Sequence, residues 1–317
     1  MNARSPLLGM GLVLVFLTAL ISGVSTFVNA YAVAGTSSDA FVTVRNLVVA
    51  LAFVPVALVA SRYLRAPALR RVDWGRLVLI GLIGGAIPFL LFFHGLELAA
   101  KAGGAVTASF AYRTLFLFAT VFGLLYLSEK FHWRVVLAAA LLLGGNILLL
   151  SWTAPIWTDG TAYVFAATVL WALEYTISKR ALRDLPSATV ALGRMGFGAV
   201  FLVGYLSLTM QWGAVGAFSG TDWAWVGISA ALLVAFVATW YPGLKRVDLG
   251  VGASVLVLGF PITWVLGLLV GTSTFTPGEA LGAFVVVAGV AVAVGLTQFR
   301  AIGDFFSRLV RPETPTT

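Results

Sequence analysis

Ten long apolar runs, separated by short polar segments, make up most of the chain. A bilayer core about 30 Å thick is crossed by about 20 apolar helical residues, and each run is close to that length. The runs are continuous rather than alternating, which favours helices over the strands of a barrel as the structures that satisfy the backbone in lipid. The predicted spans are 7–34, 41–61, 77–97, 102–128, 133–152, 160–177, 188–210, 223–241, 250–271 and 280–298.

The composition indicates that lipid surrounds most of the chain. Hydrophobic residues make up 60% of the 317 residues and charged residues only 10%, whereas an ordinary soluble domain has about 25% charged residues. The net charge of +8 does not indicate nucleic acid as a partner, because the basic residues lie in short segments between apolar runs. The absence of cysteine excludes disulfides, thiolate metal sites and cysteine nucleophiles.

The basic residues predict the orientation in the membrane. If the N-terminus is cytoplasmic, all but four of the 20 Lys and Arg residues fall on the cytoplasmic side. Lys101 falls outside, and Arg45, Arg113 and Arg194 fall within spans. The positive-inside rule predicts this asymmetry. We therefore expect a multi-pass protein of the cell (inner) membrane with both termini in the cytoplasm.

The C-terminal segment 299–317 has a different pattern. Apolar residues recur there at helical spacing with charged residues between them: Ile302, Phe305, Phe306, Leu309 and Val310, with Asp304, Arg308 and Arg311. This pattern predicts a short amphipathic helix on the cytoplasmic leaflet, followed by a disordered end at 312–317.

The two halves of the chain repeat each other. A shift of about 149 residues brings Arg45 onto Arg194, each early in the second helix of its half, and Trp74 onto Trp223. At a shift of 148, Gly104 meets Gly252. Because each half has five helices, an odd number, the second half must be inverted relative to the first. Inverted repeats with a site at the midplane are a recurrent plan for secondary transporters.

The segment 95–150 resembles the end of an EamA repeat of the drug/metabolite transporter superfamily. Its marks are a small-residue turn at 102–105, Glu129 at the end of the fourth helix, and Gly144-Gly145 in the fifth. The segment 243–295 repeats them, with Phe260-Pro261 where the family usually has a proline. In the sixth helix Trp171-Ala172 is similar to the family's Trp-Gly opening, and Ser22-Gly23 is a weaker copy in the first.

The resemblance implies an all-α membrane protein of ten transmembrane helices, built as two inverted five-helix repeats around a central cavity. The first repeat is expected at 1–152, the second at 158–298, and the tail at 299–317. Two departures stand out. The fourth helix has Tyr112-Arg113 where a proline is expected, and Thr274 stands at the position that matches Glu129.

Arg113 is the first candidate site residue, near the middle of the fourth predicted span. A charge at the bilayer centre costs roughly 2.5–3.5 kcal/mol on insertion scales, so it needs a partner or a wet cavity. The planar guanidinium matches a carboxylate. We predict that Arg113, beside Tyr112, binds a substrate carboxylate or another anion. A buried structural pair with an acid is the alternative.

Glu174 is the acid that lies well inside a predicted span, beside Trp171 and Tyr175. A buried carboxylate can carry a proton or receive a substrate ammonium. With Arg113 it would form a receptor for a zwitterion such as an amino acid, and we place Trp171 and Tyr175 in the same site. The alternative is a bridge from Glu174 to Arg113 or Arg194 that only holds helices together.

Arg45 and Arg194 are related by the repeat, so inversion predicts Arg45 near the outer face and Arg194 near the inner face. We expect a gating or structural role for this pair of charges. Cavity walls need apolar and aromatic surface around a few polar groups. The residues predicted to supply it are Phe89, Trp240, Phe260 and Trp264.

These features predict a secondary-active transporter, most simply an exporter, of small metabolites such as amino acids. Alternating access would be driven by a proton or solute gradient, because the chain has no G-x-x-x-x-G-K-[ST] motif. No histidine has a partner at metal-ligand spacing, so no metal or cofactor is expected. The alternatives are an exchanger of phosphate-bearing or other anionic metabolites or drugs, then a channel or a membrane-embedded enzyme. A monomer and a dimer are equally compatible with the sequence.

Overall fold

The computed structural model describes residues 4–32, 35–63, 69–130, 132–150 and 156–310, and all regular structure in these ranges is helical. The predicted end at 312–317 lies outside the described residues. The elements are α1 (Arg4–Ala32), α2 (Ser38–Tyr63), α3 (Arg71–Ile80), the π-helix η1 (Gly81–Ala86), α4 (Ile87–Lys101), α5 (Ala105–Arg113), α6 (Leu115–Tyr126), α7 (Trp133–Leu149), α8 (Asp159–Ala181), α9 (Ser187–Leu208), α10 (Trp212–Gly216), α11 (Gly220–Arg246), α12 (Leu249–Leu256), α13 (Gly259–Val270), α14 (Pro277–Val294) and α15 (Leu296–Val310).

Eight helical segments are long and apolar enough to cross a membrane. They correspond to α1, α2, α3–η1–α4, α5–α6, α9, α11, α12–α13 and α14. Two further predicted spans coincide with α7, an apolar helix of 17 residues, and α8, a helix of 23 residues that is not among the eight. The predicted tail helix is α15, which begins at Leu296 and packs along the start of α1.

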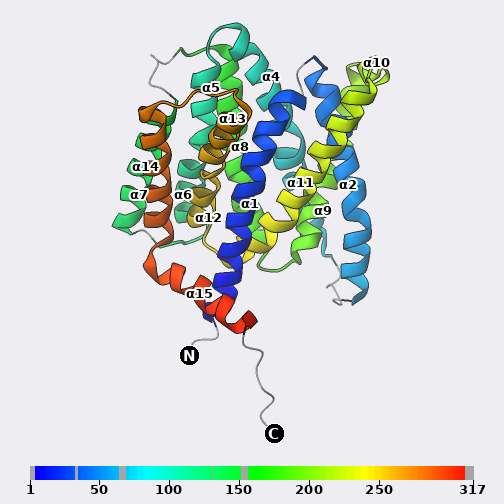
Figure 1. Cartoon of the computed structure of the whole chain (residues 1–317). Helices are drawn as coiled ribbons and strands as arrows, with labels where there is room; N and C mark the ends of the chain where they lie inside the picture. Colours follow the sequence, from blue (N-terminus) through cyan, green and yellow to red (C-terminus); the bar gives the residue numbers. More distant parts are fainter. Residues whose placement is uncertain (1–3, 33–34, 64–68, 131, 151–155, 311–317) are drawn as a thin grey trace.

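The two halves are arranged as inverted copies. Figure 1 shows that α1 begins, and α14 ends, at the end of the bundle where both chain termini lie, and that α5–α6 descends where α12–α13 ascends. The helix contacts repeat accordingly: α1 packs on α11 as α8 packs on α4, while α2 packs on α9 and α7 on α14 across the two halves. The predicted inverted repeat is therefore visible in the helix directions.

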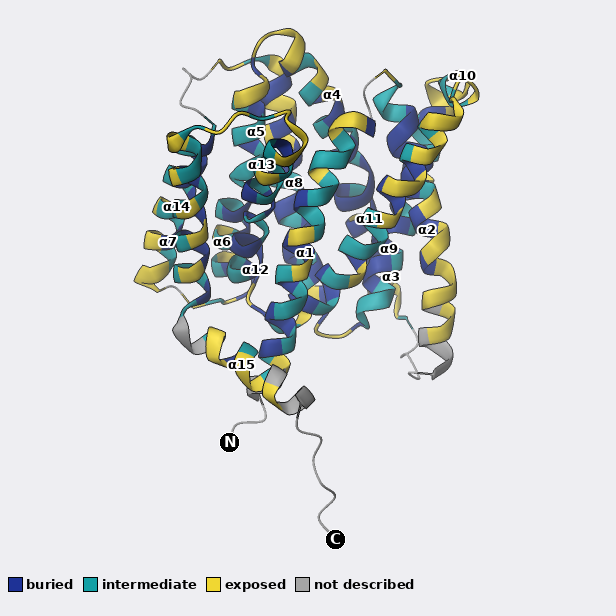
Figure 2. Cartoon of the chain, in the orientation of Figure 1, coloured by how far each residue is buried: buried dark blue, intermediate teal, exposed yellow. Residues whose placement is uncertain are grey.

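The distribution of burial fits a bundle surrounded by lipid. Large apolar side chains face outward, among them Leu51 at 62%, Leu269 at 77% and Phe284 at 70% exposed. In Figure 2 the buried positions gather where helices meet and the exposed ones lie on the outer faces. Since these outward positions are apolar, their solvent is the hydrocarbon core rather than water.

The third span of the first half is longer than its inverted counterpart. It runs over 31 residues, Arg71–Lys101, against 27 residues in Gly220–Arg246. The π-helical turn η1 lies in its middle, and such turns accommodate extra residues inside α-helices, often at functional sites. The insertion changes the repeat offset: α5 begins at Ala105 and α12 at Leu249, 144 residues later. The match of Gly104 with Gly252 at an offset of 148 is therefore wrong.

Two spans are broken in their middles. The fourth span stops as α5 at Arg113 and resumes as α6 at Leu115, although it lacks the family's proline. The hydroxyl of Thr114 donates to the carbonyl of Ala111 at 2.6 Å and so occupies a backbone acceptor at the break. The related span breaks between α12 and α13, at residues 257–258. These breaks bring irregular backbone to the centre of the bundle, where inverted-repeat transporters bind substrate.

Gly85 in η1 tests how closely η1 packs on α9. A Cβ there would collide with the backbone of Arg194 and Gly198, whereas a Cβ on Gly75, in α3 of the same span, would meet nothing. We expect Gly85→Ala to lower the free energy of unfolding by about 1–3 kcal/mol through overpacking. Gly75→Ala should instead leave it unchanged or raise it by up to about 1 kcal/mol. Thermal unfolding in detergent measures both, and equal effects would contradict the packing.

Candidate functional site

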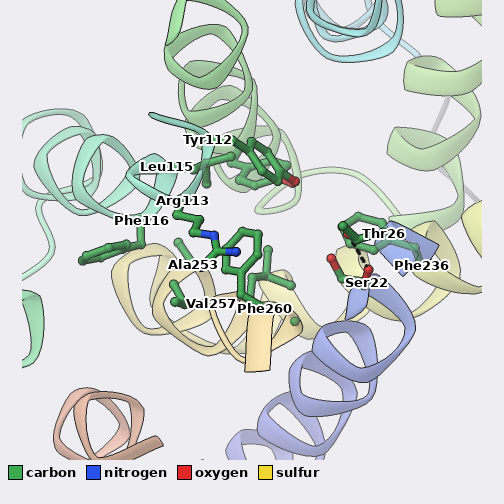
Figure 3. A pocket seen from close by; sticks show the side chains of 13 residues that line it. Ser22, Thr26, Tyr112, Arg113, Leu115, Phe116, Phe236, Ala253, Val257 and Phe260 are labelled. Atoms are coloured by element: carbon green, nitrogen blue, oxygen red, sulfur yellow. Dashed lines mark hydrogen bonds between the residues drawn. The ribbon is translucent and has the colours of Figure 1, made fainter. Parts of the chain in front are cut away.

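A small pocket lies at the centre of the bundle, where the broken helices meet α1, α8 and α11. Its volume of about 30 Å³ has room for one or two water molecules. Figure 3 shows the guanidinium of Arg113 beside the ring of Phe260, with Ser22 and Thr26 on the opposite side. The lining residues are Ser22, Thr26, Tyr112, Arg113, Leu115, Phe116, Tyr175, Phe236, Ala253, Leu256, Val257, Gly259 and Phe260.

Arg113 is the cation of this pocket, as its depth in the sequence predicted. It is the last residue of α5. Its Nη1 donates to Oδ1 of Asn146 on α7 at 3.3 Å, and its guanidinium carbon lies 4.3 Å from the ring centre of Phe260. Its buried Nε has no hydrogen-bond acceptor, and no acid of the described residues forms an ion pair with it. Arg113 therefore keeps a donor and its charge available for an anion.

The two sides of the pocket differ although the repeat relates them. The offset of 149 that relates α1 to α8 pairs Ser22 with Trp171 and Thr26 with Tyr175. The α8 side is thus filled by aromatic rings, and the α1 side is lined by small hydroxyl side chains.

Glu174 lies in a second polar cluster, next to the pocket but not lining it. The side chain is fully buried, and its Oε1 accepts hydrogen bonds from the hydroxyl of Tyr241 at 2.9 Å and from that of Ser178. Its Oε2 lies 3.9 Å from Nη1 of Arg194. The predicted bridge from Glu174 to Arg194 is present, and a bridge from Glu174 to Arg113 is absent among the described ion pairs. The two candidate charges thus have separate surroundings in this conformation.

Arg45 and Arg194 lie at the same depth. Arg194 Nε donates to the carbonyl of Gly84 at 3.2 Å, whereas Arg45 donates twice to Asn46 Oδ1, at 3.0 and 3.1 Å. Asn46 in turn donates to the carbonyl of Gly85 at 3.1 Å. The prediction that the two arginines lie near opposite faces is therefore wrong. Arg194 and Asn46 thus donate to carbonyls of η1 at the middle of the span, and Arg45 reaches η1 through Asn46.

The predicted aromatic residues divide into lining and supporting groups. Tyr112, Tyr175 and Phe260 line the pocket. Trp171 packs behind it, 5.6 Å from the ring of Tyr112, and donates its Nε1 hydrogen to the carbonyl of Gly84 at 3.2 Å.

Three further aromatic predictions do not reach the lining. Phe89 contacts the ring of Trp171 at 5.3 Å and lies 5.0 Å from the guanidinium of Arg45, and Trp240 contacts Tyr175 at 4.7 Å. Trp264 lies in α13 and donates to a carboxylate oxygen of Glu279 at 3.4 Å.

Several lining residues were not predicted. Ser22, Thr26, Phe116 and Phe236 line the pocket, and Asn146 holds the guanidinium. The repeat itself carried a signal for Ser22, because it is the partner of Trp171 under the offset of 149. Asn146 was also detectable, as a carboxamide among the apolar residues of the fifth predicted span.

Glu129, a mark of the family resemblance, has a structural contact. It follows α6 and accepts hydrogen bonds from the backbone N–H groups of Leu249 at 2.5 Å and Gly250 at 3.2 Å, at the start of α12. Burial raises the pKa of this carboxyl, and the two backbone donors act against that rise. Its contacts hold the first half to the broken helix of the second, outside the pocket.

Comparison with known proteins identifies the architecture. The sequence profile of the EamA-like transporter family matches residues 9–151 and 159–295. No curated protein matches the chain. A solved crystal structure, described only as that of a protein, has a TM-score of 0.69 with 20% sequence identity, over 95% of this chain and 99% of that chain. At that identity the likeness shows the fold alone.

Glu174→Gln tests whether the buried pair stabilises the bundle. The substitution keeps the size of the side chain but leaves the Arg194 charge uncompensated. Removing one partner of a buried ion pair typically lowers the free energy of unfolding by about 3–5 kcal/mol. Glu97→Gln is the matched control, because it breaks an exposed pair with Lys101 at 2.7 Å that contributes at most about 1 kcal/mol. We expect a lower unfolding temperature only for Glu174→Gln, measured by thermal unfolding on protein that still elutes as a folded species in gel filtration. Equal stability of the two variants would contradict this role.

Proposed function

Because the chain belongs to the EamA-like transporter family, a family of membrane transporters, we propose that it is a secondary-active carrier of small organic solutes that bear a carboxylate, amino acids foremost. Export by alternating access is the mode we assign to it. The single observation that carries the substrate class is Arg113. It is a half-buried cation of the central pocket, whose buried Nε donor has no partner and which has no acid within ion-pair distance among the described residues.

The surroundings of Arg113 support a carboxylate as the ligand. A guanidinium can donate two parallel hydrogen bonds to a carboxylate, and the amide of Asn146 already fixes one edge of the group. The hydroxyls of Ser22 and Thr26 and the ring faces of Tyr112 and Phe260 provide polar and π surface for an ammonium group. These neighbours would suit the two ends of an amino acid.

Glu174 is the group that we assign to proton coupling. It is fully buried and bound by Tyr241, Ser178 and Arg194. A carboxylate in such surroundings can exchange a proton when its cationic partner moves away. In this proposal the motion that opens the pocket separates Arg194 from Glu174 and so couples uptake of a proton to the change in access.

The shape of the pocket supports alternating access. With a volume of about 30 Å³, the pocket is too small for an amino acid, so the carrier must rearrange to admit one. The breaks at Thr114 and at residues 257–258, the π-helical turn η1 and Pro242 inside α11 are points where helices can bend. They surround the pocket, which fits a rearrangement of one half against the other.

The ten-helix count and the orientation belong to the same proposal. α7 packs along α14, and α8 packs between α4 and α6, so both share the depth of the eight apolar spans. The helix ends that carry most basic residues lie at the end of the bundle where α1 begins and α14 ends (Figure 1). The positive-inside rule makes that end cytoplasmic, and we assign the protein to the cell inner membrane.

An exchanger of phosphate-bearing metabolites is the second candidate, and the pocket disfavours it. A phosphate group carries more charge than a carboxylate and is usually bound by several cations. Among the described residues that line the pocket, Arg113 is the one cation. The lining also brings together no acid and base of the kind that a membrane-embedded enzyme would use.

Variants of Arg113 test the proposal in proteoliposomes. Counterflow of labelled amino acids, drugs and sugar phosphates identifies the substrate, since only a carrier exchanges labelled for unlabelled solute. For the solute that exchanges, we expect Arg113→Ala to lower transport roughly 30-fold or more, as expected when a buried charge loses its partner. Arg113→Lys should keep the charge but raise KM roughly ten-fold, because it cannot form the planar contact.

Arg71→Ala is the matched control, because Arg71 is exposed at the start of α3. It should transport like the unchanged protein. Transport by Arg113→Ala at the normal rate would remove the carboxylate hypothesis. Exchange of sugar phosphates without amino acids would favour the second candidate instead.

A further inference from the structure

A second and larger cleft lies away from the central pocket, between two pairs of helices. α7 packs on α14, and α6 packs on α12, but α6 and α7 scarcely touch within the described residues although they are consecutive in the chain. Figure 1 shows the α7–α14 pair at one edge of the bundle, next to α6 and α12. The cleft between them has a volume of about 710 Å³. It therefore has room for a ligand far larger than the central pocket admits.

The walls of the cleft change character along its length. Apolar side chains of α6, α7 and α12 form much of the wall: Leu117, Val121, Leu124, Val135, Ala139 and Val251. The mouth lies where α6 ends and α7 begins, at the end of the bundle that holds the chain termini, and it is charged. Phe116, buried to 98%, lines both the cleft and the central pocket and separates them.

The mouth of the cleft holds two acids, Glu129 and Asp248, and two cations that bind backbone carbonyls, Lys179 and Arg183. Both oxygens of Glu129 accept backbone hydrogen bonds at the start of α12, and Asp248 immediately precedes that helix. Lys179 donates to the carbonyls of Leu244 and Val247 at 2.7 and 2.5 Å, next to these acids. Arg183 donates to the carbonyl of Leu127 at 3.2 Å. The two acids are therefore matched in number by two cations of the cleft, Lys179 and Arg183.

Lys130 and Arg134 remain as the excess positive charge of the mouth. Both side chains are exposed, both line the cleft, and neither forms an ion pair among the described residues. Lys130 lies in the turn from α6 to α7, and Arg134 is the second residue of α7, with His132 between them in the sequence. The cleft thus presents two free cations at the membrane surface above an apolar channel that faces the hydrocarbon core.

We propose that this cleft binds one anionic phospholipid from the leaflet on the side of the chain termini. Its phosphate lies between Lys130 and Arg134, and an acyl chain runs along α6 and α7 toward Phe116. A phospholipid combines an anion and a long apolar chain in the order that the cleft presents them, and basic pockets between transmembrane helices commonly bind anionic headgroups. The lipid would fill the space between the α7–α14 pair and the helices that line the central pocket.

Lipid retention by the full-length protein tests the site. The purified protein is delipidated, titrated with phosphatidylglycerol or phosphatidylcholine, and examined by native mass spectrometry for bound lipid. We expect one phosphatidylglycerol to bind in preference to phosphatidylcholine. The double variant Lys130→Gln/Arg134→Gln should weaken its binding roughly ten-fold, and the control Arg71→Gln/Arg300→Gln, which removes two exposed cations elsewhere at the same end, should not.

Ala139→Trp tests the apolar part of the cleft, because it fills the wall of α7 and leaves the charges in place. It should also abolish retention of phosphatidylglycerol while the protein stays monodisperse in gel filtration. Glycerol 3-phosphate, which has the headgroup charge but no chains, should fail to displace the lipid.

Three results would overturn the proposal. Retention unchanged in the double charge variant would remove the headgroup site. Retention unchanged in Ala139→Trp, or displacement by glycerol 3-phosphate, would reduce the effect to attraction at the membrane surface. If Ala139→Trp blocks transport but not lipid retention, the cleft is a path for substrate instead. Since the Arg113 variants report on transport alone, failure of the lipid site leaves the proposed function standing.

Discussion

The need to compensate charge in the membrane interior constrains the rest of this structure. Glu174, Arg45 and Arg194 are all at most 3% exposed, and each would be costly in hydrocarbon without a partner. Glu174 and Arg194 face each other. The carbonyl of Gly84 in η1 accepts a hydrogen bond from Arg194, and that of Gly85 accepts one from Asn46. The side-chain oxygen of Asn46 in turn accepts hydrogen bonds from Arg45. Glycines at 81, 84 and 85 let α8 and α9 approach closely enough for these contacts. The π-helical turn in the longer third span is therefore part of the polar cluster, because its carbonyls accept hydrogen bonds from Arg194 and Asn46.

Function requires departures from the symmetry that the repeat imposes. The scaffold is duplicated, but Arg113 has no basic counterpart in α12–α13, and Glu174 corresponds to Ser25 under the offset of 149. Large rings of Tyr175 and Trp171 stand on the α8 side, and the small hydroxyls of Ser22 and Thr26 stand on the α1 side. A symmetric pair of such sites would place like charges close together at low dielectric. One cation in the pocket and one compensated cluster beside it avoid that repulsion.

The sequence predicted the lipid-exposed bundle, the inverted duplication and part of the pocket. Apolar length and the distribution of basic residues carry that information, because they reflect solvation by lipid. Arg113, Tyr112, Tyr175 and Phe260 were predicted from depth and from family resemblance, and they line the pocket.

Other features depend on geometry that a linear pattern does not contain. The break at Thr114 occurs without a proline, and the partner of Glu174 depends on helix rotations that bring Arg194, rather than Arg113, toward it. After the longer third span the repeat offset differs, so that α5 and α12 begin 144 residues apart. Arg45 and Arg194 precede that span in their halves, and their shared depth beside η1 depends on how α2 and α9 pack. Trp264 was expected in the cavity wall as an aromatic residue of the ninth span, but it donates to Glu279 in the first turn of α14.

The central claim is that water and substrate reach the pocket beside Arg113, and single cysteines test it directly because the chain contains none. Ser22→Cys places a thiol in the pocket lining, and Ala19→Cys places one at a fully buried position one turn away on α1. The account predicts that a membrane-impermeant thiol reagent labels Ser22→Cys from one side of proteoliposomes, more slowly when the transported solute is present, and leaves Ala19→Cys unlabelled. Ser22→Cys that stays unreactive from both sides, or reacts at a rate that no transported solute changes, would contradict it.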